Sequence, residues 1–170
     1  KSDWTTIAQQ HMRAQLRKMS EQMGLAHVNV GEQEAETFAE PIALHAAVAR
    51  SIALHHAIDP TGPFSLPTKA GQLNWSFGDA MQGVQSSTGA DYGLFIWVRD
   101  SYASAERKAA MVALALLGVG LTAGQQIGYA SLVDLKSGQV LWFNRLARGT
   151  GDLREAASAA ETIAELLRDF

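Results

Sequence analysis

Two runs of β-forming residues flank a short turn between Gln126 and Leu146. Residues 126–133 and 139–146 are rich in branched, aromatic and other apolar side chains, whereas the five residues from Asp134 to Gly138 contain Asp, Ser and Gly. Those three residue types favour turns, and two β-type runs separated by such a turn predict a hairpin. This hairpin, with strands near 126–134 and 139–146, commits the chain to a β-sheet.

A third strand is predicted near 91–99, because Tyr92-Gly-Leu-Phe-Ile-Trp-Val98 is apolar throughout. A strand with one wet face alternates between apolar and polar residues, so this run predicts a central strand that is covered on both faces. A short alternating run predicts one more strand near 26–30. Helical spacing of apolar residues predicts helices near 3–23, 42–57, 76–88, 104–117 and 152–168, with Ser76 and Asp79, and Asp152 and Glu155, as capping pairs.

These elements predict an α/β (α+β) fold. We expect a single mixed β-sheet, with a central apolar strand and a C-terminal hairpin, flanked by helices on both faces. A length of 170 residues suits one domain spanning 1–170, and an apolar content of 47% excludes a disordered chain. Fourteen Lys and Arg against seventeen Asp and Glu leave a net charge of −3, which makes nucleic acid an improbable partner.

Three histidines form the one candidate constellation for chemistry. The predicted helix 42–57 carries His55 on its apolar face and His45 and His56 beside that face; the other residues of the face are Leu44, Ala47, Val48, Ser51 and Ile52. One hypothesis is a small hydrolase or metal-dependent enzyme that combines His45, His55 or His56 with a distant carboxylate. Because the sequence contains no known catalytic motif, we assign no catalytic, cofactor-binding or metal-binding residues.

The segment from Ala109 to Gln126 contains no charged residue. A helix that is apolar nearly all round needs cover on every side, and one small sheet can cover only one side. We therefore predict that this segment contributes to a partner contact, through Leu117, Gly118, Gly120, Leu121 and Gly124. The alternative is that other helices, or a strand upstream of Lys1, complete its burial.

Two motifs resemble a group of bacterial envelope lipoproteins. Thr88-Gly-Ala-Asp-Tyr92 leads into the apolar strand, and Ser131-Leu-Val-Asp-Leu-Lys-Ser-Gly-Gln-Val-Leu-Trp142 forms the predicted hairpin. The group includes the curli secretion lipoprotein, the lipoprotein activators of penicillin-binding proteins, and the amino-terminal domain of the Tol periplasmic propeller protein. Its fold resembles anticodon-binding domains, and its members bind or assemble without catalysis.

The resemblance implies a location and a mode of action. It implies a non-catalytic lipoprotein of the periplasm, anchored to the outer membrane, that binds another envelope protein or associates with itself. Contact with the membrane surface would be made through the lipid anchor, and no cofactor is implied. Because that group begins with a strand before its first helix, the resemblance also implies that a strand and a lipidated N-terminus lie upstream of Lys1.

Overall fold

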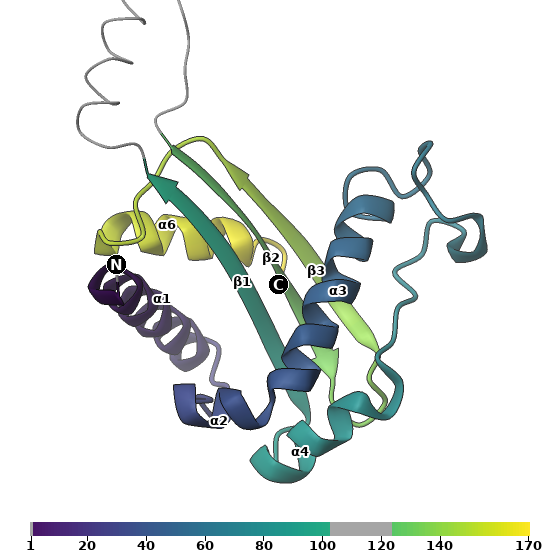
Figure 1. The fold of residues 1–170 in the computed structure, drawn as a ribbon, viewed down its shortest axis with the longest axis horizontal. Coiled ribbons are helices and arrows are strands. Elements are labelled where there is room, and N and C mark those ends of the chain that lie inside the picture. Colours follow the sequence, from purple (N-terminus) through teal and green to yellow (C-terminus); the bar gives the residue numbers. More distant parts are fainter. Residues whose placement is uncertain (1, 103–123) are drawn as a thin grey trace, which may run out of the picture. The chain divides into compact units, whose positions relative to one another are not determined.

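A computed structural model describes residues 2–102 and 124–170 (Figure 1). The helices are α1 (Ser2–Gln22), α2 (Glu32–Thr37), α3 (Ala39–His55), α4 (Gln82–Thr88) and α6 (Ala156–Leu166), with 3-10 turns η1 (Pro67–Lys69) and η2 (Gly78–Met81). The strands are β1 (Tyr92–Tyr102), β2 (Gly124–Asp134) and β3 (Val140–Arg148). Among the described residues, no helix is both long and apolar enough to cross a membrane.

The three strands form one antiparallel sheet in the order β1-β2-β3, and helices flank it. The α+β class is therefore confirmed, although the sheet is antiparallel where a mixed one was predicted. The prediction of a central strand at 91–99 is wrong for the described sheet, because β2 occupies its centre and β1 lies at its edge. The uniform apolar run indicated that both faces of the strand are covered. Cover of the faces does not determine whether one or two strands pair with its edges.

The predicted hairpin is confirmed as β2, a turn and β3. Asp134 makes the turn: its carboxylate accepts the backbone N–H groups of Lys136 at 3.0 Å and Ser137 at 2.8 Å. The Ser137 N–H is the main reason that the pKa of Asp134 lies below its usual value. Gly138 closes the turn with a φ of +70°, a conformation that favours glycine, and a Cβ here would meet the Gly78 carbonyl oxygen at 2.2 Å.

Two other local predictions are wrong. The strand near 26–30 is absent; this segment has no regular structure, and Val28 is 64% exposed. Three alternating apolar residues cannot form a strand without a neighbouring strand, and in the described part of the chain none pairs with them. The last helix begins at Ala156 and not at Asp152, and its N-cap is Glu155. The Asp152 carboxylate accepts the Arg154 backbone N–H at 2.9 Å and binds the Arg154 guanidinium at 2.6 Å.

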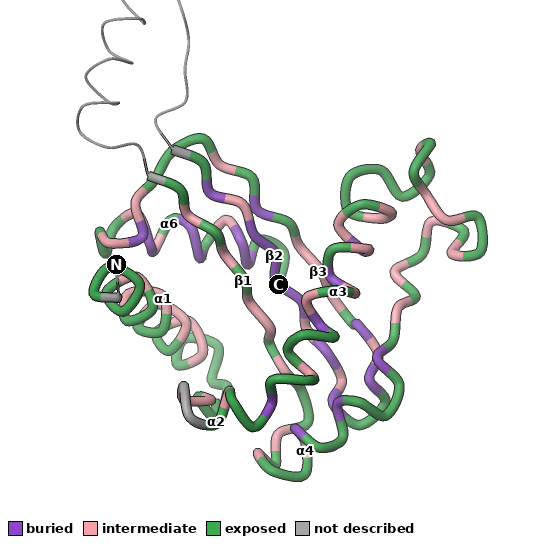
Figure 2. Tube along the Cα trace, in the orientation of Figure 1, coloured by how far each residue is buried: buried purple, intermediate pink, exposed green. Residues whose placement is uncertain are grey.

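The described chain divides into two compact units, and each strand contributes residues to both. The first unit contains residues 2–25, 98–102, 124–128 and 146–169, and the second contains 26–97, 129–145 and 170. Buried positions follow β2 through both units (Figure 2). The prediction of one domain is not decided by this division and stays a prediction.

A buried polar network organises the first unit. The Thr162 hydroxyl on α6 donates to the Gln126 side-chain carbonyl at 2.7 Å and accepts from the Arg148 guanidinium at 2.9 Å. The Gln126 amide donates in turn to the Asp100 carboxylate at 3.1 Å. Because Gln126 and Thr162 are both buried, these bonds satisfy polar groups that would otherwise be costly to remove from water.

An apolar core organises the second unit. It joins Ile52 of α3 and Met81 of η2 to Val133, Leu135 and Val140 of the hairpin, all of them almost wholly inaccessible to solvent. Phe38, Phe77 and Val84 complete this core. Burying an aliphatic side chain of this size contributes about 1.5 to 3 kcal/mol. The core therefore anchors α3, η2 and α4 to the hairpin.

Candidate interaction surface

His45 lies in the apolar core of the second unit. Its side chain is 4% exposed, its Nε2 shares a hydrogen bond with the Ser131 hydroxyl of β2, and its ring stacks on Phe95 of β1 at 4.4 Å between centroids. Burial lowers the pKa of His45 from 6.5 to about 4. His45 is consequently a neutral, hydrogen-bonded core residue at neutral pH.

The hydrogen bonds described for the other two histidines of the hypothesised cluster join them to backbone carbonyls and not to His45. His55 Nδ1 donates to the Phe64 carbonyl at 2.7 Å, in the loop after α3. His56 follows the last residue of α3, and its backbone N–H donates to the Ile52 carbonyl at 2.9 Å. Within residues 2–102 and 124–170, no group of three or more histidines and acids could hold a metal ion. The described contacts therefore give the enzyme hypothesis no support, and the non-catalytic role stays a prediction.

The buried face of α3 differs from the predicted one. His45, Ala49 and Ile52 point into the core, whereas Leu44 and Ala47, which were predicted to be on the inner face, are exposed. The helix is apolar nearly all round, so hydrophobic spacing could not select the correct face. Because His45 was placed beside the apolar face and not on it, its burial was missed. His45 lies four residues before Ala49 and seven before Ile52, and this helical spacing is the signal that could have predicted its burial.

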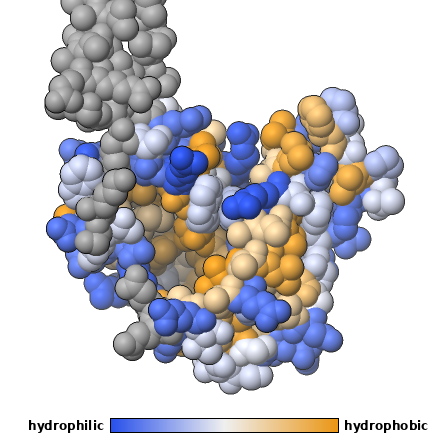
Figure 3. Space-filling view, in the orientation of Figure 1, coloured by the Kyte–Doolittle hydropathy of each residue, from blue (hydrophilic) through white to orange (hydrophobic). Residues whose placement is uncertain are grey.

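The outer face of α3 exposes apolar side chains. We use this name for Leu44, Ala47 and Leu54, which are all exposed, together with the two charged residues of the helix, Glu40 and Arg50. Figure 3 shows apolar residues gathered over α3 and over the loop after it, where Ile58 and Phe64 are also exposed. A helix with so little polar surface is usually buried, so this face is a candidate for contact with a partner.

β1 exposes apolar side chains on both faces at the edge of the sheet, with Tyr92 and Leu94 on one face and Trp97 on the other. Tyr92 is 56% exposed, Leu94 38% and Trp97 39%. Trp97 also stacks on Tyr129 of β2 at 5.2 Å, and Tyr129 stacks on Phe143 of β3 at 6.2 Å. Burial raises the pKa of Tyr129. This aromatic row holds the Trp97 ring on one face of the sheet while leaving part of it accessible.

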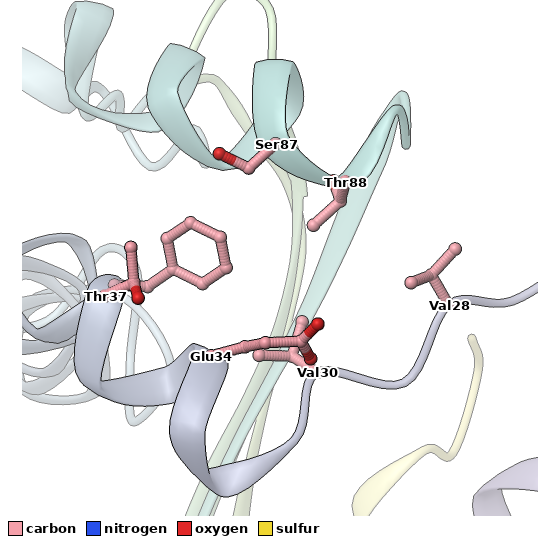
Figure 4. Close-up of a pocket in the computed structure, with 7 residues that line it drawn as sticks. Val28, Val30, Glu34, Thr37, Ser87 and Thr88 are labelled. Carbon is pink, nitrogen blue, oxygen red and sulfur yellow. The ribbon is translucent and has the colours of Figure 1, made fainter.

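A shallow groove lies between α2 and the end of α4 (Figure 4). Its volume is about 210 Å³, and Figure 4 shows Glu34 and Thr37 opposite Ser87 and Thr88. The Glu34 carboxylate already accepts the Gly31 N–H at 2.8 Å. Pockets for small molecules usually occupy about 300 to 1,000 Å³, so we assign no ligand to this groove.

The predicted contact segment cannot be compared with the structure. Leu117, Gly118, Gly120 and Leu121 lie outside the described residues, and Gly124 is the first residue of β2. The sequence analysis identified neither surface described above, although it found that residues 92–98 are too apolar to have a wet face. Comparison of the chain with protein-family models, curated proteins and solved structures finds no match.

Proposed function

We propose that this protein is a non-catalytic binding or assembly protein of the bacterial cell envelope. Binding is supported by one observation, namely the apolar side chains that β1 and the outer face of α3 expose on the second unit. Large apolar patches on a folded domain mark contact sites more often than single exposed residues do. Nothing in the chemistry of the described histidines offers an equally specific alternative.

The location rests on the resemblance to envelope lipoproteins. The motif residues 131–142 form the end of β2, the turn and the start of β3, and residues 88–92 join α4 to β1. By this resemblance, the protein acts in the periplasm and is anchored to the outer membrane through a lipid on its N-terminal segment. Its partner is another envelope protein or a second copy of itself.

Site-specific photo-cross-linking tests this proposal in cells. The full-length protein, with a photoreactive residue at Leu54 of α3 or Leu94 of β1, is expressed from its own gene and irradiated. Ser86 of α4, an exposed polar position in the same unit, provides the matched control. We expect protein adducts from Leu54 or Leu94 and none from Ser86.

Cell fractionation tests the location separately. We expect the protein in the outer-membrane fraction. Recovery from the cytosol would contradict the envelope location, and absence of adducts from both Leu54 and Leu94 would contradict the binding role.

A further inference from the structure

Among the described strands, none pairs with the outer edge of β1. β1 pairs with β2 alone, and no strand in the described part of the chain lies on its other side. The opposite edge of the sheet is partly closed, because Phe77 donates to Gly138, and Val140 donates to Trp75, both at 2.9 Å. An open edge presents a row of unpaired backbone N–H and C=O groups that can pair with another strand.

Residues 92–98 of β1 lack the features that usually protect an edge strand, because they include no proline and no charge. Charges follow at Arg99 and Asp100, and the Asp100 carboxylate is bonded inside the fold to the Gln126 amide at 3.1 Å and the Leu153 N–H at 3.0 Å. Proteins commonly block such edges with proline, with inward-pointing charges, or with a very short strand. β1 is 11 residues long and exposes Tyr92 and Leu94 in its first three positions.

The sequence of β1 is complementary to itself in an antiparallel arrangement centred on Phe95. In this register, residues at equal distances on either side of Phe95 lie opposite each other on the two strands. The resulting pairs are Asp91 with Arg99, Tyr92 with Val98, Gly93 with Trp97, and Leu94 with Ile96. Asp91 and Arg99, which lie at the two ends of the apolar run, thus form two equivalent attractive pairs between the copies. Every other pair is apolar or joins an aromatic ring to glycine.

The neighbouring registers lack this complementarity. A two-fold axis perpendicular to the sheet keeps each face on its own side, so the centre can move only by whole residues. Centring on Leu94 places Arg99 opposite Gly89, and centring on Ile96 places it opposite Gly93. In both cases Asp91 also loses its basic partner, so charge selects the register centred on Phe95.

Gly93 needs to lack a Cβ because of packing within the fold. A Cβ there would lie 2.8 Å from the Phe95 ring and 2.9 Å from the Leu135 side chain, so a larger residue would disturb that packing. These two side chains already cover the Gly93 backbone, and the choice of register therefore rests on the two Asp91–Arg99 pairs.

We propose that two copies of this protein pair through their β1 edges and join their three-stranded sheets into one continuous antiparallel sheet. The inference rests on the proposed function, because it identifies a second copy as one partner of a binding protein. Backbone hydrogen bonds supply the affinity of such strand addition, and the side-chain pairs fix the register.

Charge reversal tests the pairing. The purified full chain is studied by sedimentation velocity over a concentration series, together with Asp91→Arg, Arg99→Asp and the double variant. Each single change places like charges opposite each other twice, so the dissociation constant should rise on the order of tenfold. The double variant exchanges the two charges and should restore association, while circular dichroism checks that all variants remain folded.

Disulfide trapping tests the register. The chain contains no cysteine, so Tyr92→Cys in one copy can be mixed with Val98→Cys in another. Opposite residues have Cβ atoms about 4.5 to 5.5 Å apart, which permits a disulfide. Two copies of the same variant would hold their cysteines six residues apart, or about 20 Å along the strand. A disulfide-linked dimer is expected from the mixture and from neither variant alone.

The outcomes separate this inference from the proposed function. Restoration by the double variant, with cross-linking only in the mixture, supports pairing through β1. A monomer at every concentration overturns it, and so does a dimer that is insensitive to both charge reversals and untrapped in the mixture, since that dimer uses another surface. A monomer that still forms adducts with a different envelope protein from Leu54 would refute the self-pairing and leave the proposed function intact.

Discussion

Acidification should destabilise the second unit through His45. Burial holds the pKa of His45 at about 4 in the folded protein, whereas an unfolded histidine has a pKa near 6.5. The unfolded chain therefore binds this proton more readily, and stability falls as the pH decreases from 6.5. The fall ends below about pH 4, where the folded protein also takes up the proton.

The expected loss is on the order of 3 kcal/mol between pH 7 and pH 4, because each tenfold change in proton affinity corresponds to about 1.4 kcal/mol. Urea denaturation at a series of pH values measures it, followed by tryptophan fluorescence; Trp75, Trp97 and Trp142 all lie in the second unit. The variant His45→Gln keeps a polar side chain but cannot bind a proton in this range. Its unfolding free energy should vary less with pH, whatever its stability at pH 7.

His27→Gln is the comparison variant, because it replaces an exposed histidine of the same unit without altering the buried core. Equal pH dependence in the unaltered protein and in His45→Gln would refute the reasoning. A folded-state NMR titration in which the His45 ring takes up its proton near pH 6.5 would refute it too.

Three further substitutions test the packing. Ile52→Ala removes a fully buried side chain from the core of the second unit, and we expect it to lower the unfolding free energy in urea by about 2 to 5 kcal/mol. Gly138→Ala forces a Cβ against a backbone carbonyl at positive φ, so its melting temperature should fall; Gly83→Ala, in α4 with open space around it, should not lower it. Gln126→Leu breaks the buried polar network and should cost about 1 to 3 kcal/mol in urea, whereas Gln125→Leu, at the exposed neighbouring position, should cost far less.

The parts of the fold that sequence predicted are those with local causes. The hairpin follows from Asp134 and Gly138, whose turn chemistry acts within five residues. α1 spans Ser2–Gln22, close to the predicted 3–23, and ends before Gly24 at a φ of +66°. In contrast, the predicted start at Asp152 is wrong: its carboxylate bonds the backbone N–H and the guanidinium of Arg154, and the helix begins four residues later.

The candidate site was harder to predict because it depends on distant contacts. His45 is buried by Phe95 and Ser131, which lie 50 and 86 residues further along the chain. The spacing of apolar residues within the helix cannot predict contacts with such distant residues. Likewise, an apolar strand signals covered faces, while its place in the sheet depends on which other segments become strands. Within residues 2–102 and 124–170, β2 is the one strand that pairs with β1.

β1 and α3 both expose apolar side chains in the structure. The sequence predicted cover on both faces for β1 and one apolar face for α3, and the described fold leaves apolar side chains of each accessible to solvent. A second copy paired along β1 would cover Leu94 and complete the backbone hydrogen bonds of the edge. The outer face of α3 would stay free for a different partner, which is why Leu54 and Leu94 are separate positions in the cross-linking test.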